Sequence, residues 1–149
     1  MTPEIAIGLV TALGLGALVG LERQWRQRSS GMATHAMVAL GAASFSILPL
    51  LLDNEVSVTR MAAQVVSGIG FLGAGVIMRD GLNVRGLNTA ATLWCTAAIG
   101  VLCSMGLLLE ATLGSLVVLC ANILLRDIAQ RLNRQDVLPA SEAEQRYEV

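Results

Sequence analysis

The charged residues divide this chain into long uncharged segments that are rich in apolar side chains. Five such segments follow one another, at residues 5–21, 29–52, 61–78, 86–109 and 111–125. A helix rises about 1.5 Å per residue and the hydrocarbon core of a bilayer is about 30 Å thick, so segments of this length suit membrane spans. A spanning backbone must also satisfy its own hydrogen bonds, which favours helices. The pattern predicts an all-α, polytopic transmembrane bundle of about five helices.

The boundary between the fourth and fifth segments is the weakest, because only Gly106 and Glu110 interrupt the apolar pattern there. We interpret these segments as a helical hairpin, with helices at about 87–104 and 107–125. One long tilted helix is the alternative.

Composition excludes several other classes of protein. Hydrophobic residues make up 54% of the chain and charged residues 14%, whereas a soluble domain carries roughly 25% charged residues. The lipid bilayer is therefore an expected partner, and the lack of a basic stripe with interleaved aromatic residues argues against nucleic acid. The three cysteines lie in apolar segments without CxxC spacing, which is typical of buried thiols. We expect no metal and no cofactor.

The arginines predict the orientation in the membrane. With five spans, nine of the ten arginines fall on the side that receives segments 22–28 and 79–85 and the C-terminal tail, while Arg60 falls on the other side. Positively charged residues stay in the cytoplasm. We therefore expect a bacterial inner-membrane protein with a periplasmic N-terminus and a cytoplasmic C-terminus.

The apolar spacing changes after the last segment. Leu125, Ile128, Ala129 and Leu132 keep a helical period while arginines project elsewhere, so the fifth helix is expected to continue as an amphipathic end along the cytoplasmic leaflet. We assign residues 1–134 to the transmembrane domain with this end. Residues 135–149 are assigned to a linker or to the start of a further cytoplasmic domain.

Small residues recur at helical spacing in the first segment, where every fourth position brings them onto one face. Such a face lets a second backbone approach closely inside a membrane. We expect it to pack against another helix of this chain, although a second copy in a homo-oligomer or another protein remains open. The residues are Gly8, Ala12, Gly16 and Gly20.

A second group of glycines lies in the third segment. Gly68, Gly70 and Gly73 match the pattern GxGxxG, and Gly75 follows. A dinucleotide site requires that pattern between a strand and a helix, whereas here it lies in an apolar run. Close helix packing or an irregular helix is the favoured interpretation, and backbone lining a conduit is the minor one.

The richest polar cluster joins the third and fourth segments on the predicted cytoplasmic side. One interpretation is structural, with a turn at residues 80–81 and a cap of the fourth helix by Asn88 or Thr89. The other is a docking surface for a partner or a ligand, and both can hold. The candidate residues are Arg79, Asn83, Arg85 and Asn88.

Four further residues on the same side are functional candidates. Glu22, Arg23 and Arg26 end the first segment, and a pairing of Glu22 with Arg85 across the interface is one possible contact. His35 lies near the start of the second segment, as a buried hydrogen-bonded residue or as a proton-sensitive group.

The predicted spans lack acidic residues up to Glu110, which lies at the outer rim. Ion pathways usually place ionisable residues or oxygen ligands at membrane depth. This argues against an ion carrier, and no nucleophile–base pair indicates an enzyme, so no catalytic residue is expected.

Long stretches of the sequence resemble the MgtC/SapB family over nearly the whole chain. They are GLERQWRQR at 20–28, THAMVALGAA at 34–43, the run 62–103 that contains GIGFLGAGVIMRDGLNVRGLNTAA, and CANILLRDIAQRLN at 120–133. The resemblance implies a membrane domain of the bacterial inner membrane, with a role in growth at low magnesium and in survival inside macrophages. It implies a non-enzymatic regulator and virulence factor that restrains the F-type ATP synthase through its membrane sector.

The same resemblance implies that Asn88, within the match to NVRGLNTAA, is required for function. Two departures are visible: many relatives have Arg where this chain has Ala33, and longer relatives continue into a soluble domain resembling an ACT module. A channel or transporter for Mg²⁺ or another ion is the alternative function.

Overall fold

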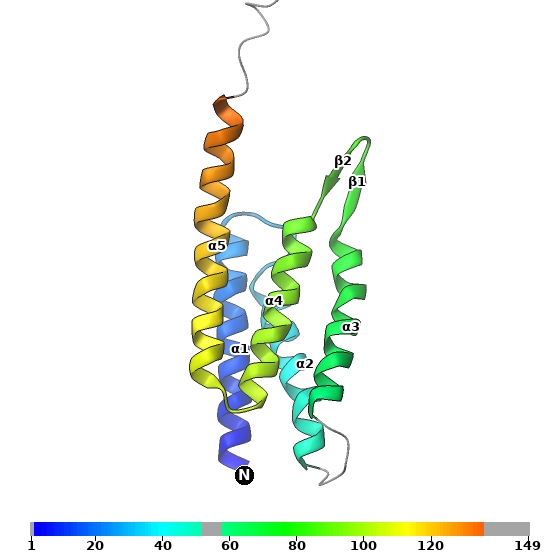
Figure 1. The fold of residues 1–149 in the computed structure, drawn as a ribbon, viewed down its shortest axis with the longest axis vertical. Helices are drawn as coiled ribbons and strands as arrows, with labels where there is room; N and C mark the ends of the chain where they lie inside the picture. Colours follow the sequence, from blue (N-terminus) through cyan, green and yellow to red (C-terminus); the bar gives the residue numbers. More distant parts are fainter. Residues whose placement is uncertain (1, 52–57, 136–149) are drawn as a thin grey trace, which may run out of the picture. The chain divides into compact units, whose positions relative to one another are not determined.

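The computed structural model describes residues 2–51 and 58–135, which fold into helices and one short hairpin (Figure 1). The helices are α1 (Thr2–Trp25), α2 (Met32–Leu51), α3 (Val58–Val76), α4 (Leu87–Ser104) and α5 (Leu108–Gln135), and the strands are β1 (Met78–Asp80) and β2 (Asn83–Arg85). The expected bundle of about five helices is confirmed. The hairpin between α4 and α5 is also confirmed, whereas the small β-hairpin was not predicted.

Within the described residues, four helices are long and apolar enough to cross a membrane, at residues 3–25, 32–51, 87–104 and 108–125. The third predicted span differs, because α3 is a helix of 19 residues but is not among these four. Its first turns carry Arg60 and Gln64, and glycines replace larger apolar residues in its second half. It nevertheless packs beside α2 and α4.

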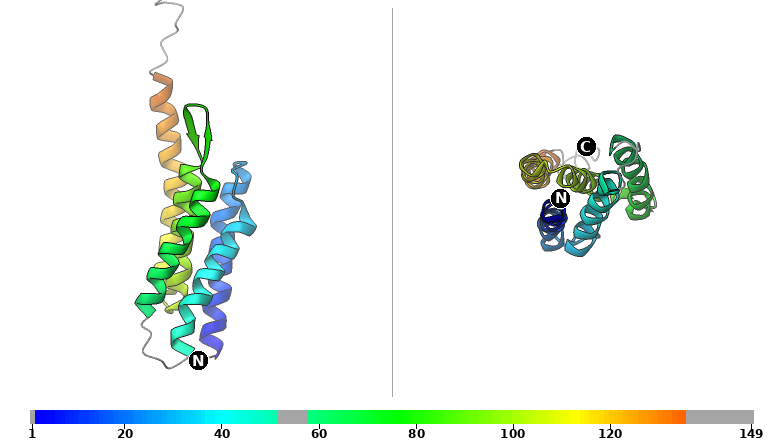
Figure 2. Two further views of the ribbon diagram at one scale, coloured as in Figure 1. Left: turned by 90° about the vertical axis from the view of Figure 1, so that its right-hand side faces the viewer. Right: turned by 90° about the horizontal axis from the view of Figure 1, so that it is seen from below.

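The chain separates into two compact units, residues 1–118 and 119–149. In the first unit successive helices alternate in direction, so the α1–α2 loop and the β-hairpin lie at one end and the α4–α5 turn lies at the other (Figures 1 and 2). In the second unit α5 continues to Gln135, and Leu124, Leu125 and Ile128 are exposed along it. The predicted linker after residue 135 lies outside the described residues.

Two helix ends are closed by the same backbone motif. At the end of α1 the N–H groups of Gln27 and Arg28 donate to the carbonyls of Gln24 and Arg23, and Gln27 has a φ of 53°. At the end of α4 the N–H groups of Gly106 and Leu107 donate to the carbonyls of Cys103 and Leu102. Both are Schellman caps, which place one residue in the left-handed region. Gly106 suits that position, as the predicted turn required.

The core of the first unit is a close packing of small residues from α1, α2 and α4. A Cβ added at Gly16 would lie 2.6 Å from the carbonyl oxygen of His35 and 2.8 Å from the Cβ of Ala39. Ala39 is fully buried, and on its other side a Cβ at Gly100 would overlap its backbone carbonyl. Three helix backbones therefore approach one another around Ala39.

The rest of the small-residue face of α1 lies along the same contacts. A Cβ at Gly8 would lie 2.7 Å from the carbonyl oxygen of Cys103, and one at Gly20 would lie 2.6 Å from the Cα of Met32. Ala12 is fully buried between them. The structure therefore brings this face against α2 and α4 of the same chain.

The glycines of α3 are placed differently. A Cβ at Gly68, Gly70 or Gly75 would meet no atom of the described residues within 4 Å, and one at Gly73 would lie 3.6 Å from the Cβ of Ala90. Helix α3 packs through Ile69, which clusters with buried alanines of α2 and α4, and through Val65 beside it. Close packing by the GxGxxG glycines is therefore not what holds α3 in the described bundle.

The packing around Gly16 predicts a contrast between two glycines of one helix. Gly16→Ala forces a methyl group against the α2 backbone and should cost about 1–3 kcal/mol, as overpacking does. Gly14→Ala points into open space and should be neutral or stabilising, because alanine favours a helix. Thermal unfolding of the purified protein in detergent measures both, and equal effects of the two variants would contradict the packing.

Candidate functional site at the arginine-rich end

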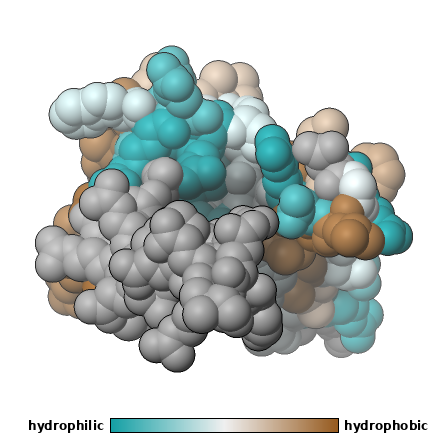
Figure 3. Space-filling view, turned by 90° about the horizontal axis from the view of Figure 1, so that it is seen from above, coloured by the Kyte–Doolittle hydropathy of each residue, from teal (hydrophilic) through white to brown (hydrophobic). Residues whose placement is uncertain are grey.

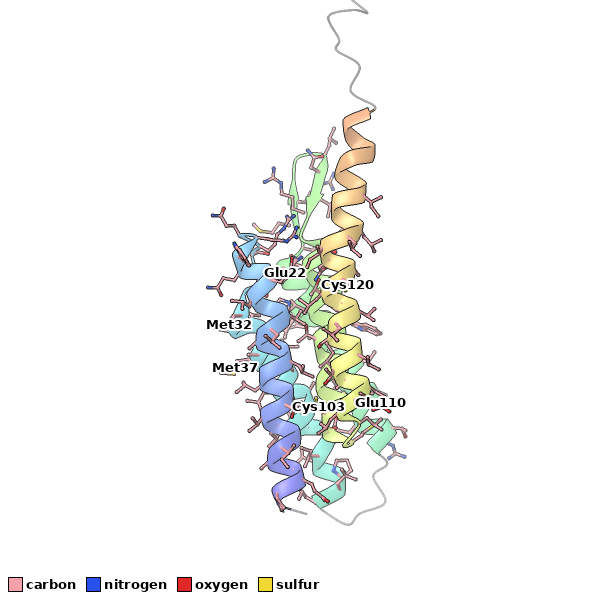
Figure 4. All side chains as sticks on the ribbon, turned by 90° about the vertical axis from the view of Figure 1, so that its left-hand side faces the viewer. Glu22, Met32, Met37, Cys103, Glu110 and Cys120 are labelled. Atoms are coloured by element: carbon pink, nitrogen blue, oxygen red, sulfur yellow. The ribbon has the colours of Figure 1, made fainter. Side chains whose placement is uncertain are left out.

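The polar candidates gather at the end of the first unit that carries the α1–α2 loop and the β-hairpin. Figure 3 views this end and shows hydrophilic residues grouped on it, with hydrophobic residues at its margin. In Figure 4 Glu22 lies at this end and Glu110 at the opposite one. Arginines of the loop and of the hairpin therefore share one end, as the alternating helix directions require.

Arg23 joins α1 to α4 at this end. It lies in the last turn of α1 and is 3% exposed, and its Nη2 donates to Thr89 Oγ1 at 2.7 Å. Thr89, in the first turn of α4, is also buried. A hydrogen bond from a charged donor in a buried place is worth more than a neutral one. The contact ties the end of α1 to the start of α4.

Glu22 is paired within its own helix. Its Oε1 lies 2.8 Å from the Nε of Arg26, one turn later, and its side chain is 10% exposed against 30% for Arg26. The structure thus pairs Glu22 with Arg26, whereas the sequence suggested Arg85 as its partner. Within the described residues, Glu22 Oε2 is buried without a hydrogen-bond partner.

His35 is fully buried near the start of α2. Its Nδ1 lies 3.0 Å from the carbonyl oxygen of Gly31, so this nitrogen is the N–H donor, and Nε2 of the neutral ring is an acceptor. Nε2 and the Oγ of Ser30 are buried and have no hydrogen-bond partner among the described residues. The buried, hydrogen-bonded interpretation of His35 fits this geometry.

The polar segment between α3 and α4 forms a β-hairpin whose turn has two residues, 81 and 82. Met78 pairs with Arg85, Arg79 with Val84 and residue 80 with Asn83. The turn follows at Gly81, where φ is 60°, and the Nε of Arg79 donates to its carbonyl at 3.1 Å. A positive φ at the first turn position is what this hairpin turn requires. The predicted turn is present, with strands on both sides of it.

The predicted cap of α4 is wrong. The N-cap residue is Gly86, with a φ of 90° and no capping side chain. A Cβ at this position would overlap the carbonyl of Val76 at the end of α3, so only glycine fits. Asn88 lies inside the first turn with an exposed side chain, and its carbonyl accepts from the hydroxyl of Thr92 at 2.7 Å. Helix capping is therefore not the role of the Asn88 side chain.

Sequence reasoning missed two of the contacts that shape this end. Thr89 was considered as a cap, whereas it accepts from Arg23. Gln24 was not considered, although its Oε1 accepts from the backbone N–H of Met32 at 3.2 Å and so caps α2. Neither residue type indicates such a role in the sequence, because each contact joins residues of two different helices.

The described residues hold no group of three or more His, Cys, Asp or Glu side chains that could bind a metal ion. The three cysteines are free, and Cys103 is the buried one. The chemistry of this end is therefore that of hydrogen bonds and arginine charges.

Apolar spanning helices with one polar, arginine-rich end define a multi-pass membrane protein. The sequence profile of the MgtC family matches residues 9–131. Protein MgtC of Salmonella paratyphi A is 60% identical over 147 residues, which cover 99% of this chain and 62% of the relative. Protein MgtC of Brucella abortus is 53% identical over 85% of this chain and 53% of the relative. An uncharacterized protein of Synechocystis is 54% identical over 89% of this chain and 56% of the relative.

No solved structure matches the chain. The chain belongs to the MgtC family, and it spans less than two thirds of the length of these relatives.

The bond between α1 and α4 predicts the effect of one small substitution. Thr89→Val keeps the shape of the side chain but removes one acceptor of Arg23, and should cost about 1.5–3 kcal/mol, as for hydrogen bonds to charged groups. Thr34→Val, at an exposed position of α2, should change stability by less than about 0.5 kcal/mol. Thermal unfolding in detergent measures both. A Thr89→Val protein as stable as the parent would show that the bond from Arg23 does not stabilise the bundle.

Proposed function

We propose that this chain is a non-enzymatic regulatory protein of the bacterial inner membrane, which docks onto a membrane protein complex with its arginine-rich end. The observation that carries the proposal is the exposure of Arg79, Asn83, Arg85 and Asn88 on one short segment. That segment is anchored on both sides, by the fit of Gly86 on the end of α3 and by the buried Arg23–Thr89 bond. We call these four residues the docking surface.

The docking surface has the chemistry of a recognition site. Arginine offers planar pairs of donors that suit carboxylates of a partner, and an asparagine amide both donates and accepts. Asn88 lies in the first turn of α4, so little backbone freedom is lost when it binds. A polar, partly exposed interface of this kind is typical of regulatory contacts.

The family supplies the partner in this proposal. We infer that the complex is the F-type ATP synthase, restrained through its membrane sector, and that the restraint supports growth at low Mg²⁺ and survival inside macrophages. The comparison with proteins named MgtC supports this inference. Because this chain spans 62% of the Salmonella relative, the activity of the whole protein belongs to the proposal too.

The proposal requires the docking surface to face the cytoplasm, with the N-terminus in the periplasm. Single cysteines at Gln27 and Glu110, in a protein without the native three, should then react from opposite sides of the membrane. Gln27 lies in the α1–α2 loop and Glu110 near the α4–α5 turn. An impermeant maleimide applied to whole cells should label the Glu110 position alone. Labelling of the Gln27 position instead would reverse the orientation and remove the proposed contact.

Asn88 allows the docking role to be tested apart from stability. Because its side chain is exposed and does not cap the helix, Asn88→Ala and Asn88→Asp should change the free energy of unfolding by less than about 0.5 kcal/mol. Both should nevertheless fail to support growth at low Mg²⁺ in a strain that lacks its own family member. In membrane vesicles, ATP-driven proton pumping should fall with the parent protein and stay unchanged with either variant.

Ser44→Ala is the matched control, since Ser44 is an exposed polar residue of α2 that bonds to the carbonyl of Leu40. It should behave as the parent in both assays. Full growth with both Asn88 variants, at equal protein levels, would exclude Asn88 from the docking surface.

A further inference from the structure

A lateral groove runs between α2 and α3 in the first unit. It has a volume of about 690 Å³, and Ala42 and Ala97 are buried at its base. Gly41 and Gly68 also line it and keep it open, because neither has a side chain to fill it. Volumes of this size hold ligands in other proteins. The groove lies beside α2, which is one of the helices long and apolar enough to cross a membrane.

The length of the groove corresponds to one leaflet. On α2 its lining extends from Thr34 to Phe45, which is about 16 Å of helix at about 1.5 Å per residue. Half of the hydrocarbon core is about 15 Å. Thr34 lies near the arginine-rich end, and Gln64, the other polar lining residue, lies toward the opposite end. The apolar walls between them match a hydrocarbon chain in length and chemistry.

The end of the groove near Thr34 lies on the basic side of the bundle. The β-hairpin continues directly from α3 and carries the exposed side chains of Arg79 and Arg85. The long stem of an arginine can follow an apolar surface while its charged head stays at the interface. Basic residues beside a cleft at the membrane surface are typical of sites for anionic lipid headgroups.

We propose that this groove binds one acyl chain of an anionic phospholipid, whose headgroup lies in the leaflet on the arginine-rich side. The chain packs on Ala42 and Ala97, and the phosphate lies near the β-hairpin, whose opposite faces carry Arg79 and Arg85. Gln64 lines the groove toward the end opposite to the headgroup. The groove itself lies between α2 and α3, whereas Arg79 and Arg85 also belong to the docking surface.

Native mass spectrometry of the protein after delipidation tests this site. Phosphatidylglycerol and phosphatidylethanolamine with the same acyl chains are added back, and the parent should retain the anionic lipid preferentially. Gly68→Leu fills the groove and should lower the retained phosphatidylglycerol about tenfold, which corresponds to about 1.4 kcal/mol. Gly41→Leu enters the groove from the other helix and should have the same effect, so the test survives if one variant does not fold.

Gly70→Leu is the matched control, because Gly70 lies on the same helix, also faces open space and does not line the groove. It should retain the lipid as the parent does. Arg79→Gln with Arg85→Gln should abolish the preference for the anionic lipid, whereas Arg60→Gln, at the opposite end of α3, should leave it intact.

Other occupants give different results. Equal lipid retention by the Gly68→Leu and Gly70→Leu proteins would overturn the proposal. A dimer that Gly68→Leu disrupts while lipid retention stays unchanged would assign the groove to a second copy. A copurified partner lost with Gln64→Leu would assign it to a foreign helix that bonds to this amide. Equal retention of the two lipids by the parent would contradict the proposed preference for an anionic headgroup.

Discussion

The bundle depends on the close approach of three backbones around Ala39. Inside a bilayer the hydrophobic effect does not drive helices together, because lipid tails are as apolar as the side chains they touch. Dispersion contacts and good shape complementarity must hold the helices instead. Glycines at residues 16 and 100 allow α1 and α4 to contact the α2 backbone itself. This contact sets the spacing of α1, α2 and α4.

The polar end illustrates that dependence. Arg23 is 3% exposed and reaches Thr89 on another helix, which is possible only where α1 and α4 are already held close. A buried guanidinium without acceptors would be costly, so the small-residue packing and the polar contact favour the same arrangement. Gly86 adds a second constraint at the end of α3. The docking surface is therefore held by backbone packing on one side and by a charged hydrogen bond on the other.

Most of the fold followed from the sequence because membrane spans leave a strong one-dimensional signal. The apolar segments predicted the helices, and the spacing from Gly8 to Gly20 predicted the face of α1 that packs. Gly100 was missed, because a single glycine in an apolar helix gives no period. Gln27 was missed as a cap residue, because a positive φ is rare for glutamine and its sequence carries no sign of it.

The candidate site was predictable in its location but not in its contacts. Charge asymmetry placed segments 22–28 and 79–85 at one end, since arginines of alternating loops share one end of a bundle. Their partners depend on the rotation of each helix about its axis, which apolar composition does not determine. The bond from Arg23 to Thr89 and the pair of Glu22 with Arg26 are of this kind. Asn88 was wrongly expected to cap α4, because Gly86 occupies the N-cap position and Asn88 lies inside the helix.

Helix α3 connects the two proposed sites. It contributes Ile69 to the core, and three of its glycines meet no neighbour in the described bundle, so fewer contacts fix its position than fix those of α1, α2 and α4. The β-hairpin follows it within two residues, and Met78 begins the first strand. A lipid chain in the groove would add contacts along α3, and any ligand that favours one position of a helix shifts its equilibrium toward that position. If both sites exist, lipid occupancy and partner binding are therefore thermodynamically coupled through α3, and each must alter the affinity of the other by the same factor.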